Sequence, residues 1–371
     1  GFDVVARTVI NNAGKLISSQ KLTVDGTALV NRNGLISGWE GLIVKGASLD
    51  NRAGGTLSSR NGNVRVALQG ELLNSGSGAL VSHGTLNVSA GSLDNSDKGI
   101  ISSGEGQTLA VDGTLSNAQG GLIDSGATLN INSGALSNVG GTVNAQQAIE
   151  VSATGLDNRN GQIVSDAAIN LKLSGQLNNS AGKLAGAGPL SIKGVTDLGN
   201  RNGQLISQST LDLQTQSLDN SDKGTLAASG ELTISASGAV LNHADGLIYS
   251  QTAGLVLKAN SLSNAKGAIQ SQNGLTLDVI ADLDNQSGRI IAETGAVSVN
   301  AASIDNRGGV LASIKGLLEA RTVGVLRNGV DLNNNRQGGI IQAQGLKVTA
   351  LAGLSNSGGR ISAQAADLSI T

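Results

Sequence analysis

Residues 156–165, with the sequence LDNRNGQIVS, decide the fold of this protein. A leucine is followed by one variable residue and then by Asn158, and Gly161 precedes a run in which Ile163 and Ser165 occupy alternate positions. Residues 198–207, LGNRNGQLIS, repeat the same order. Alternation with a period of two places every second side chain on one face of a strand. The stretch therefore predicts a short β-strand after a glycine-containing corner.

The asparagine of this motif recurs along the whole chain, each time two residues after an apolar residue. The first and last copies are 345 residues apart, which gives a mean spacing of 21.6 residues over 16 intervals. Each unit also has a second alternating aliphatic pair, such as Leu211 and Leu213. The seventeen copies are Asn11, Asn31, Asn51, Asn74, Asn95, Asn117, Asn138, Asn158, Asn179, Asn200, Asn220, Asn242, Asn264, Asn285, Asn306, Asn334 and Asn356.

Each unit of about 21 residues thus consists of three short strand-like segments separated by glycine-rich corners. One such unit is too small to bury its own apolar face, but stacked copies bury a continuous core. We therefore predict an all-β fold, a right-handed parallel β-helix of about 17 coils. The recurring asparagines share the inward phase of the core residues, so we expect them to hydrogen-bond to one another as a ladder along the axis.

The composition agrees with narrow coils and excludes several kinds of site. The chain has 54 glycines, one proline, 1% aromatic residues and 39% hydrophobic residues. With no cysteine and two histidines, disulfides and thiolate or histidine metal centres have almost no ligands. The net charge of −2 argues against nucleic-acid binding, and no apolar run is long enough to span a bilayer. We predict no catalytic residue, metal or cofactor.

We expect residues 1–371 to form a single continuous repeat shaft, and the chain to be an internal piece of a larger protein. One interval is irregular, because the gap from Asn306 to Asn334 is 28 residues. We therefore predict an irregular coil with a loop insertion at residues 307–333. The insertion is either a tolerated bulge or a partner-contacting loop at residues 314–330 that carries Arg321 and Arg327.

Other polar and aromatic side chains are weaker candidates for a site. The aspartates that precede ladder asparagines are spread over many coils, so we interpret them as solvated turn residues rather than as an acid pair. We interpret the arginines that follow the asparagines as a solvated edge, although a row of arginines would suit acidic glycans. We expect His83 and Tyr249 to face solvent, and Trp39 to cover a corner or to form an exposed contact.

The repeat resembles the filamentous haemagglutinin repeat. The resemblance rests on residues 156–163, LDNRNGQI, and residues 304–311, IDNRGGVL, and it covers essentially the whole chain. This family builds the shafts of large exoproteins of Gram-negative two-partner secretion systems, including host-directed adhesins and contact-dependent growth inhibition effectors. The resemblance implies a β-helical shaft, export by an outer-membrane secretion transporter, and a secreted or cell-surface location.

Three functions follow from these observations. The first is a non-enzymatic rigid shaft that presents distal adhesive or toxin domains. The second is a shaft that itself binds a host-cell or bacterial receptor. The third and most remote is a β-helical polysaccharide-degrading enzyme, which would need clustered acids on adjacent coils. Among the aspartates that directly precede a ladder asparagine, only Asp284 and Asp305 lie on neighbouring repeats.

Overall fold

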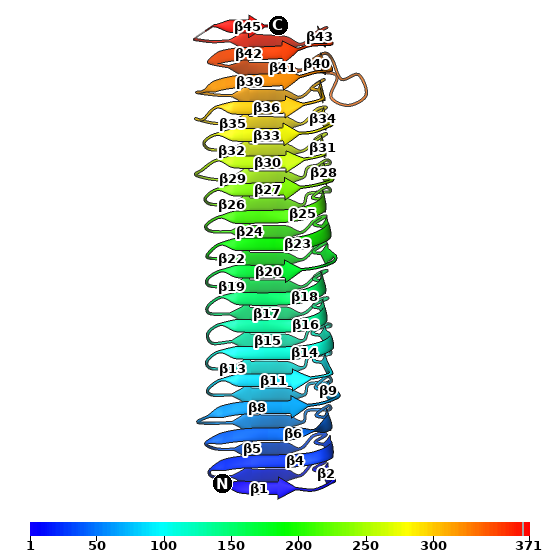
Figure 1. Ribbon diagram of the computed structural model, residues 1–371, viewed down its shortest axis with the longest axis vertical. Coiled ribbons are helices and arrows are strands. Elements are labelled where there is room, and N and C mark those ends of the chain that lie inside the picture. The colour runs from blue at the N-terminus through cyan, green and yellow to red at the C-terminus, as the bar shows by residue number, and fades with distance from the viewer. Residues whose placement is uncertain (366) are drawn as a thin grey trace. The chain divides into compact units, whose positions relative to one another are not determined.

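A computed structural model describes residues 1–365 and 367–371, and in that part of the chain every regular element is a β-strand. The chain divides into two compact units. Unit 1 comprises residues 1–178 and 182–187, and unit 2 comprises residues 179–181 and 188–371. Within each unit, successive strands of one side lie next to one another in parallel register (Figure 1). The predicted parallel β-solenoid is confirmed.

One side of each coil is a four-residue strand that follows the asparagine corner. In unit 1 these strands are β3 (Lys15–Ser18), β5 (Leu35–Gly38), β7 (Thr56–Ser59), β10 (Ala79–Ser82), β13 (Ile100–Ser103), β15 (Leu122–Ser125), β17 (Thr142–Ala145), β19 (Gln162–Ser165) and β22 (Lys183–Gly186). In unit 2 they are β24 (Gln204–Ser207), β26 (Thr225–Ala228), β29 (Leu247–Ser250), β32 (Ala268–Ser271), β35 (Arg289–Ala292), β38 (Val310–Ser313), β41 (Ile340–Ala343) and β44 (Arg360–Ala363).

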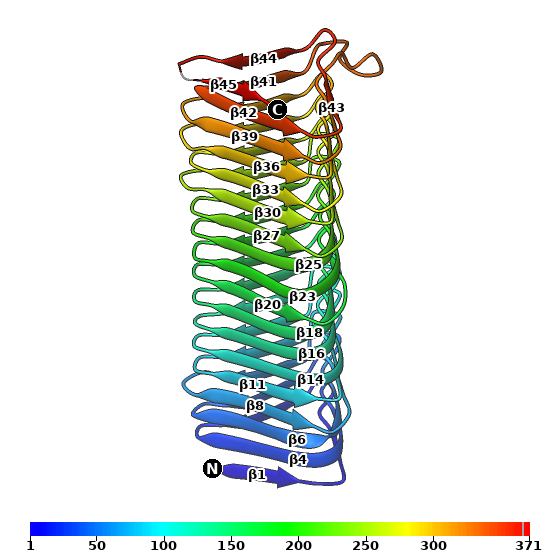
Figure 2. The same ribbon diagram turned by 45° about the horizontal axis from the view of Figure 1, so that its top comes forward.

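The other two sides are formed by one long bent strand or by a pair of shorter strands, stacked as Figure 2 shows for β25, β27 and β30. In unit 1 they are β1 (Phe2–Val5), β2 (Thr8–Ile10), β4 (Lys21–Val30), β6 (Gly41–Asp50), β8 (Asn63–Leu68), β9 (Glu71–Leu73), β11 (Leu86–Ala90), β12 (Ser92–Asp94), β14 (Gln107–Ser116), β16 (Leu129–Ser137), β18 (Ile149–Asp157), β20 (Ile169–Leu173) and β21 (Leu177–Asn178). In unit 2 they are β23 (Leu190–Gly199), β25 (Leu211–Asp219), β27 (Leu232–Ala236), β28 (Ala239–Leu241), β30 (Leu255–Ala259), β31 (Ser261–Ser263), β33 (Leu275–Val279), β34 (Asp282–Asp284), β36 (Val297–Ala301), β37 (Ser303–Asp305), β39 (Leu317–Thr322), β40 (Val325–Arg327), β42 (Gly345–Ala350), β43 (Gly353–Ser355) and β45 (Leu368–Ile370).

The core of each unit consists of aliphatic side chains stacked on their own copies. In unit 1, Ile163 is fully buried and pairs in register with Val143 on one side and Leu184 on the other. In unit 2, Leu211 pairs with Leu190 and Leu232 in the same way. Burial of each such side chain stabilises the folded state by roughly 1.5–3 kcal/mol relative to exposure to water. Because every coil offers the same interior, branched aliphatics fill it and large rings are not needed.

The glycine of the motif lets neighbouring corners approach each other closely. A Cβ atom at Gly161 would overlap the main-chain oxygen of Asn138 one coil away. The serine that ends many four-residue strands is buried as well, and its hydroxyl donates to a main-chain carbonyl, as Ser82 does to the oxygens of Gly62 and Thr85. These contacts explain why the motif requires small residues at both ends of the strand.

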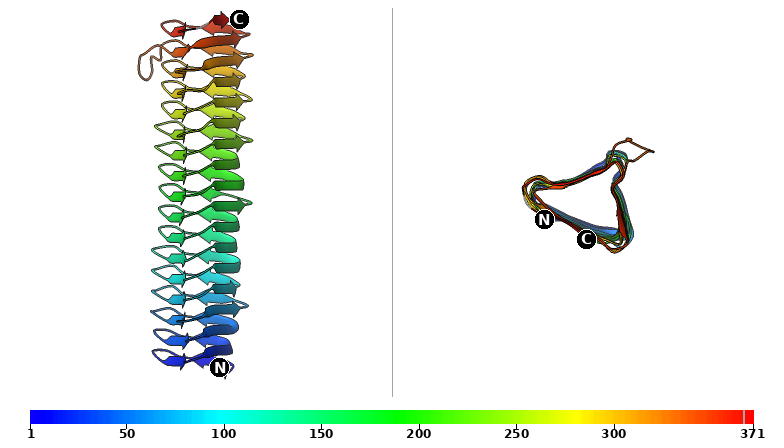
Figure 3. Two further views of the ribbon diagram at one scale, coloured as in Figure 1. Left: turned by 90° about the vertical axis from the view of Figure 1, so that its left-hand side faces the viewer. Right: turned by 90° about the horizontal axis from the view of Figure 1, so that it is seen from above.

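Seen along the axis, the coils have three sides that meet at three corners (Figure 3). Alternation in the sequence predicts the strands but not the angles between them, so this cross-section was not predicted. The single continuous shaft over residues 1–371 stays a prediction, since each unit is compact by itself. No helix in the described residues is long and apolar enough to cross a membrane.

Candidate functional site

The most regular polar feature is a ladder of buried asparagines at one corner of each unit. Within each unit, the Nδ2 group of one asparagine donates to the Oδ1 atom of the next copy, at 2.7 Å from Asn95 to Asn117 and at 2.8 Å from Asn264 to Asn285. The same Nδ2 group also donates to main-chain carbonyls; for Asn95 these are the oxygens of Gly99 and Leu122. Apart from Asn356, which is exposed, these amides are almost inaccessible to solvent, so each one satisfies donors and acceptors that would otherwise be costly to bury.

The structure places sixteen of the seventeen predicted asparagines in these ladders. In unit 1 the ladder consists of Asn11, Asn31, Asn51, Asn74, Asn95, Asn117, Asn138 and Asn158. In unit 2 it consists of Asn179, Asn200, Asn220, Asn242, Asn264, Asn285, Asn306, Asn328 and Asn356.

Asn334 was predicted as a ladder residue, and this assignment is wrong. Asn328 takes its place, accepting from Asn306 at 2.7 Å and donating to Asn356 at 2.7 Å. Both asparagines follow an apolar residue by two positions, and Asn334 also has a glycine four residues later, so the local pattern does not separate them. Burial of the preceding leucine distinguishes the two asparagines, because Leu326 is buried in register with Ile304, whereas Leu332 is 75% exposed.

Asn328 and Asn334 should respond differently to replacement by alanine. Asn328→Ala should destabilise its coil by about 3 kcal/mol, because the amide of Asn306 and the oxygen of Asn356 lose buried partners. Asn334→Ala should cost less than about 1 kcal/mol, because its amide is exposed and donates only to Asp331. Hydrogen exchange of the coils at residues 300–360 measures both effects. Equal protection in the two variants would contradict the assignment of Asn328 to the ladder.

The aspartates and arginines beside the ladder form ion pairs with each other. Asp50 lies between Arg32 and Arg52, with oxygen–nitrogen distances of 2.6 and 2.9 Å. The hydrogen bond from Arg52 is the main cause that holds the pKa of the Asp50 carboxyl well below its usual range, and the bond from Arg32 adds to it. The other pairs are Arg159–Asp157, Arg201–Asp219, Arg201–Asp222 and Arg307–Asp305. The side chains of these arginines are about half-exposed, and their charges are balanced locally.

The remaining candidates do not gather at one site. Asp284 and Asp305 are register partners, but Asp305 binds Arg307 and Asp284 accepts from the main chain of Gln286. Trp39 is 48% exposed and lies under the guanidinium of Arg60, 5.6 Å from the ring centre. Among residues 1–365 and 367–371, no three His, Cys, Asp or Glu side chains are grouped so that they could hold a metal ion.

The predicted insertion lies at residues 329–338, which we call the corner loop. The segment 314–330, predicted as a partner-contacting loop, is mostly regular strand, because β39 and β40 pair with β36 and β37 in register. Arg321 and Arg327 lie on these two strands with exposed side chains, not on a loop. The extra residues instead separate Asn328 from its corner glycine, Gly339, which is eleven positions further on rather than three or four.

The corner loop projects from one corner of unit 2 (Figures 1 and 3), and hydrogen bonds join it to the two preceding coils. Asp331 is 2% exposed and accepts a hydrogen bond from Ser287 at 2.8 Å, and the Asn335 amide donates to the Gly308 carbonyl at 2.7 Å. Burial raises the pKa of Asp331, but hydrogen bonds from Asn334 and Ser287 outweigh this effect and hold the pKa below its usual value. The sequence contained one signal for the loop, the polar run DLNNNRQ at residues 331–337.

Gly308 is the residue that makes this docking possible. Its φ of +62° is in the left-handed region, and a Cβ atom there would overlap the side chains of Asn335 and Asp331. Asp245, Lys266 and Ser287 occupy the same corner in the preceding coils, also with positive φ. The loop contacts two of these four positions: Ser287 donates a hydrogen bond to Asp331, and Gly308 is the position at which a Cβ atom would overlap loop side chains.

A cleft of about 770 Å³ lies between the tip of the corner loop and the preceding coils, which carry Asp245, Lys266 and Ser287. Its lining includes Lys266, Arg289 and the three loop asparagines Asn333, Asn334 and Asn335. A second hollow of about 540 Å³ on the same side of the solenoid is lined by Tyr249, Gln270 and, again, Arg289. Arg289 therefore borders both hollows and lies at the centre of a polar groove.

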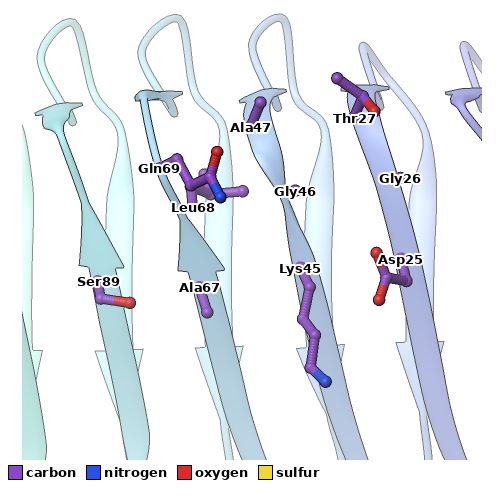
Figure 4. A pocket seen from close by; sticks show the side chains of 10 residues that line it. All are labelled: Asp25, Gly26, Thr27, Lys45, Gly46, Ala47, Ala67, Leu68, Gln69 and Ser89. Atoms are coloured by element: carbon purple, nitrogen blue, oxygen red, sulfur yellow. The ribbon is translucent and has the colours of Figure 1, made fainter.

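Unit 1 has a different groove at the bend of its long strands (Figure 4). It is lined by residues of β4, β6, β8 and β11 and by the turn after β8, and its volume is about 470 Å³. Gly26 and Gly46 leave its floor without side chains, and Asp25 and Lys45 flank it with opposite charges (Figure 4). This groove is lined mainly by small residues and by one balanced pair of charges, as is common on a solvated surface, so it does not indicate a particular ligand.

Comparison with known proteins adds one family. The family model described as the haemagglutinin repeat matches residues 1–76, 58–119, 106–181, 150–244, 246–293, 276–320 and 321–371. Neither a curated protein nor a solved structure matches the chain.

Proposed function

Because this chain belongs to the haemagglutinin repeat family, we propose that it is a rigid shaft segment of a secreted or cell-surface exoprotein of a Gram-negative bacterium. In this function it holds distal adhesive or toxin domains away from the cell and catalyses no reaction. The observation that carries the proposal is the repetition of one coil geometry, with the asparagine ladder and aliphatic stack present in both units.

The chemistry of the coil supports this mechanical function. Within each unit, successive coils are joined by main-chain hydrogen bonds, stacked aliphatic side chains and amide bridges, so bending a unit would break many contacts together. The absence of cysteine also suits export of an unfolded chain through an outer-membrane transporter, which we propose as its secretion partner. Folding coil by coil outside the cell would favour transport in one direction.

The shaft proposal is tested by a distance between the two units. The chain has no cysteine, so spin labels can be attached to Asn130→Cys and Ser298→Cys, both at exposed positions. These sites are eight repeats apart, and a rigid shaft predicts one narrow distance of about 38 Å at about 4.8 Å per coil. The control pair Asp212→Cys and Ser298→Cys lies within unit 2, four coils apart by register. A broad distribution for the first pair beside a narrow control would refute the rigid shaft.

A second candidate function is favoured by the corner loop. A loop that buries an aspartate and uses Gly308 as its docking site is a specific structure, and it presents four exposed polar residues, 333–336, beside a cleft. We propose that this part of the shaft contacts a host-cell or bacterial receptor. Labelled chain should then bind epithelial cells or bacteria saturably. Replacing residues 329–338 by Arg-Gly, the sequence of the regular corner after Asn306, should abolish binding, and no binding by the intact chain would refute the candidate.

A further inference from the structure

We propose that the groove beneath the corner loop binds an acidic oligosaccharide, with Arg289 and Lys266 holding its carboxylate. This inference rests on the second proposed function, since it names the ligand of the same site. The groove runs from the hollow beside Tyr249 and Gln270, past Arg289, to the cleft beneath Asn333. All of these residues belong to unit 2.

The charge of the groove favours an anionic ligand. In the described part of the chain, Lys266 and Arg289 form no ion pair, although each of the arginines Arg32, Arg52, Arg159, Arg201 and Arg307 is paired with an aspartate. Arg289 lies one coil after Ala268, the second residue beyond Lys266, so the two cations border the same cleft. Asp245 borders it from the coil before. In the hollow beside Tyr249, Lys315 and Glu293 lie 3.8 Å apart as an ion pair, so their charges balance. The two unpaired cations and one carboxylate that remain leave a net positive groove on a chain whose total charge is −2.

The neutral part of the groove favours a hydroxyl-rich ligand over a peptide. Asn333, Gln270 and Gln272 provide amides that can both donate to and accept from hydroxyl groups. Tyr249, the only tyrosine of the chain, adds a half-buried ring whose flank can cover the apolar face of a sugar. The strands beneath, β29, β32, β35 and β38, are each paired on both sides, so a peptide finds no free strand edge to join.

The corner loop provides the wall that the other coils lack. Arg289 has a register equivalent in Arg360, which lies two coils beyond Val310 and points outward from the same side of the solenoid. Arg360 donates to Gln342 at 2.8 Å and does not border the loop cleft. Arg360 is therefore a matched control for Arg289, with the same side chain on the same sheet but outside the groove.

The test is a titration of saccharides into the purified full chain. Binding is detected by protein NMR and by calorimetry. The probes are 3′-sialyllactose, representing glycans of animal cells, and a disaccharide of 3-deoxy-octulosonate, representing bacterial envelope glycans. Lactose serves as the neutral control and hexaglutamate as the acidic peptide. We expect one carboxylated saccharide to bind saturably, and lactose and hexaglutamate not to compete. Whichever saccharide binds identifies the source of the ligand.

The variants decide whether binding occurs in this groove. Arg289→Gln and Asn333→Ala should each weaken saccharide binding about tenfold or more, whereas Arg360→Gln should leave it unchanged. Gly308→Ser should displace the loop and give the same loss; the exposed Asn333→Ala variant keeps the test valid if that protein fails to fold. No saturable saccharide binding, equal binding of hexaglutamate, or full binding by Arg289→Gln would overturn the inference. Cell binding that is lost on replacing residues 329–338, without binding of either saccharide, would overturn this inference and leave the receptor proposal standing.

Discussion

Leu211→Asp should open the coils around it, with a loss of about 4 kcal/mol or more in local stability. Leu211 is 1% exposed and stacks between Leu190 and Leu232, so the new carboxylate would be buried without a partner. Limited proteolysis and hydrogen exchange of residues 188–240 measure the effect. Global unfolding measures it less well, because in a stacked-repeat protein each coil contacts only its neighbours.

The matched control for this prediction is Gln214→Asp. It introduces the same charge on the same strand, β25, but residue 214 faces solvent. The control should keep the protection and protease resistance of the parent protein. If Leu211→Asp remains as resistant as Gln214→Asp, the inward stack does not stabilise the coil in the way described above.

Asn264→Asp should destabilise unit 2 strongly at pH 7 and less at lower pH. At neutral pH the carboxylate cannot donate to Asn285 or to the carbonyl of Arg289, and it adds a buried charge. Burial raises the pKa of the new carboxyl in the folded state above its unfolded value of about 3.9. The folded state then binds the proton more tightly, so stability should rise as the pH falls through the folded-state pKa towards the unfolded one.

Hydrogen exchange at a series of pH values, corrected for the intrinsic exchange rate, measures this reversal. The control is Asn260→Asp, because Asn260 is exposed at a corner of a neighbouring strand. It should change stability by less than about 0.5 kcal/mol and show no recovery in acid. A loss in Asn264→Asp that is equal at pH 7 and at low pH would contradict the role of this asparagine as a donor in the ladder.

The repeat was predictable because the same local requirements occur in every coil. An inward position must be aliphatic, the corner must accommodate close backbone approach at residues such as Gly161, and the amide must satisfy buried carbonyls. Each requirement involves neighbours at a constant separation of about 21 residues, so it appears in the sequence as a period. The strands, their parallel pairing and the ladder follow from that period.

The groove and the ion pairs were less predictable, because they depend on contacts that occur once. Asp50 was interpreted as a solvated turn residue, but the fold places it between Arg32 and Arg52. The insertion was placed at residues 307–333, because Asn334 matches the local motif as well as Asn328 does. Periodicity carries no information where the period is interrupted.

By itself, the sequence determined that this chain is a stack of β-coils with an aliphatic core and a buried amide ladder, since those features depend on periodic neighbours. Only the tertiary structure decided which asparagine continues the ladder after Asn306, and that the inserted residues fold back over Ser287 and Gly308. The physical reason is the difference in burial: Leu326 fits the core stack and Leu332 does not, so the chain adopts the register that buries Leu326 and leaves the loop to form the wall of a groove.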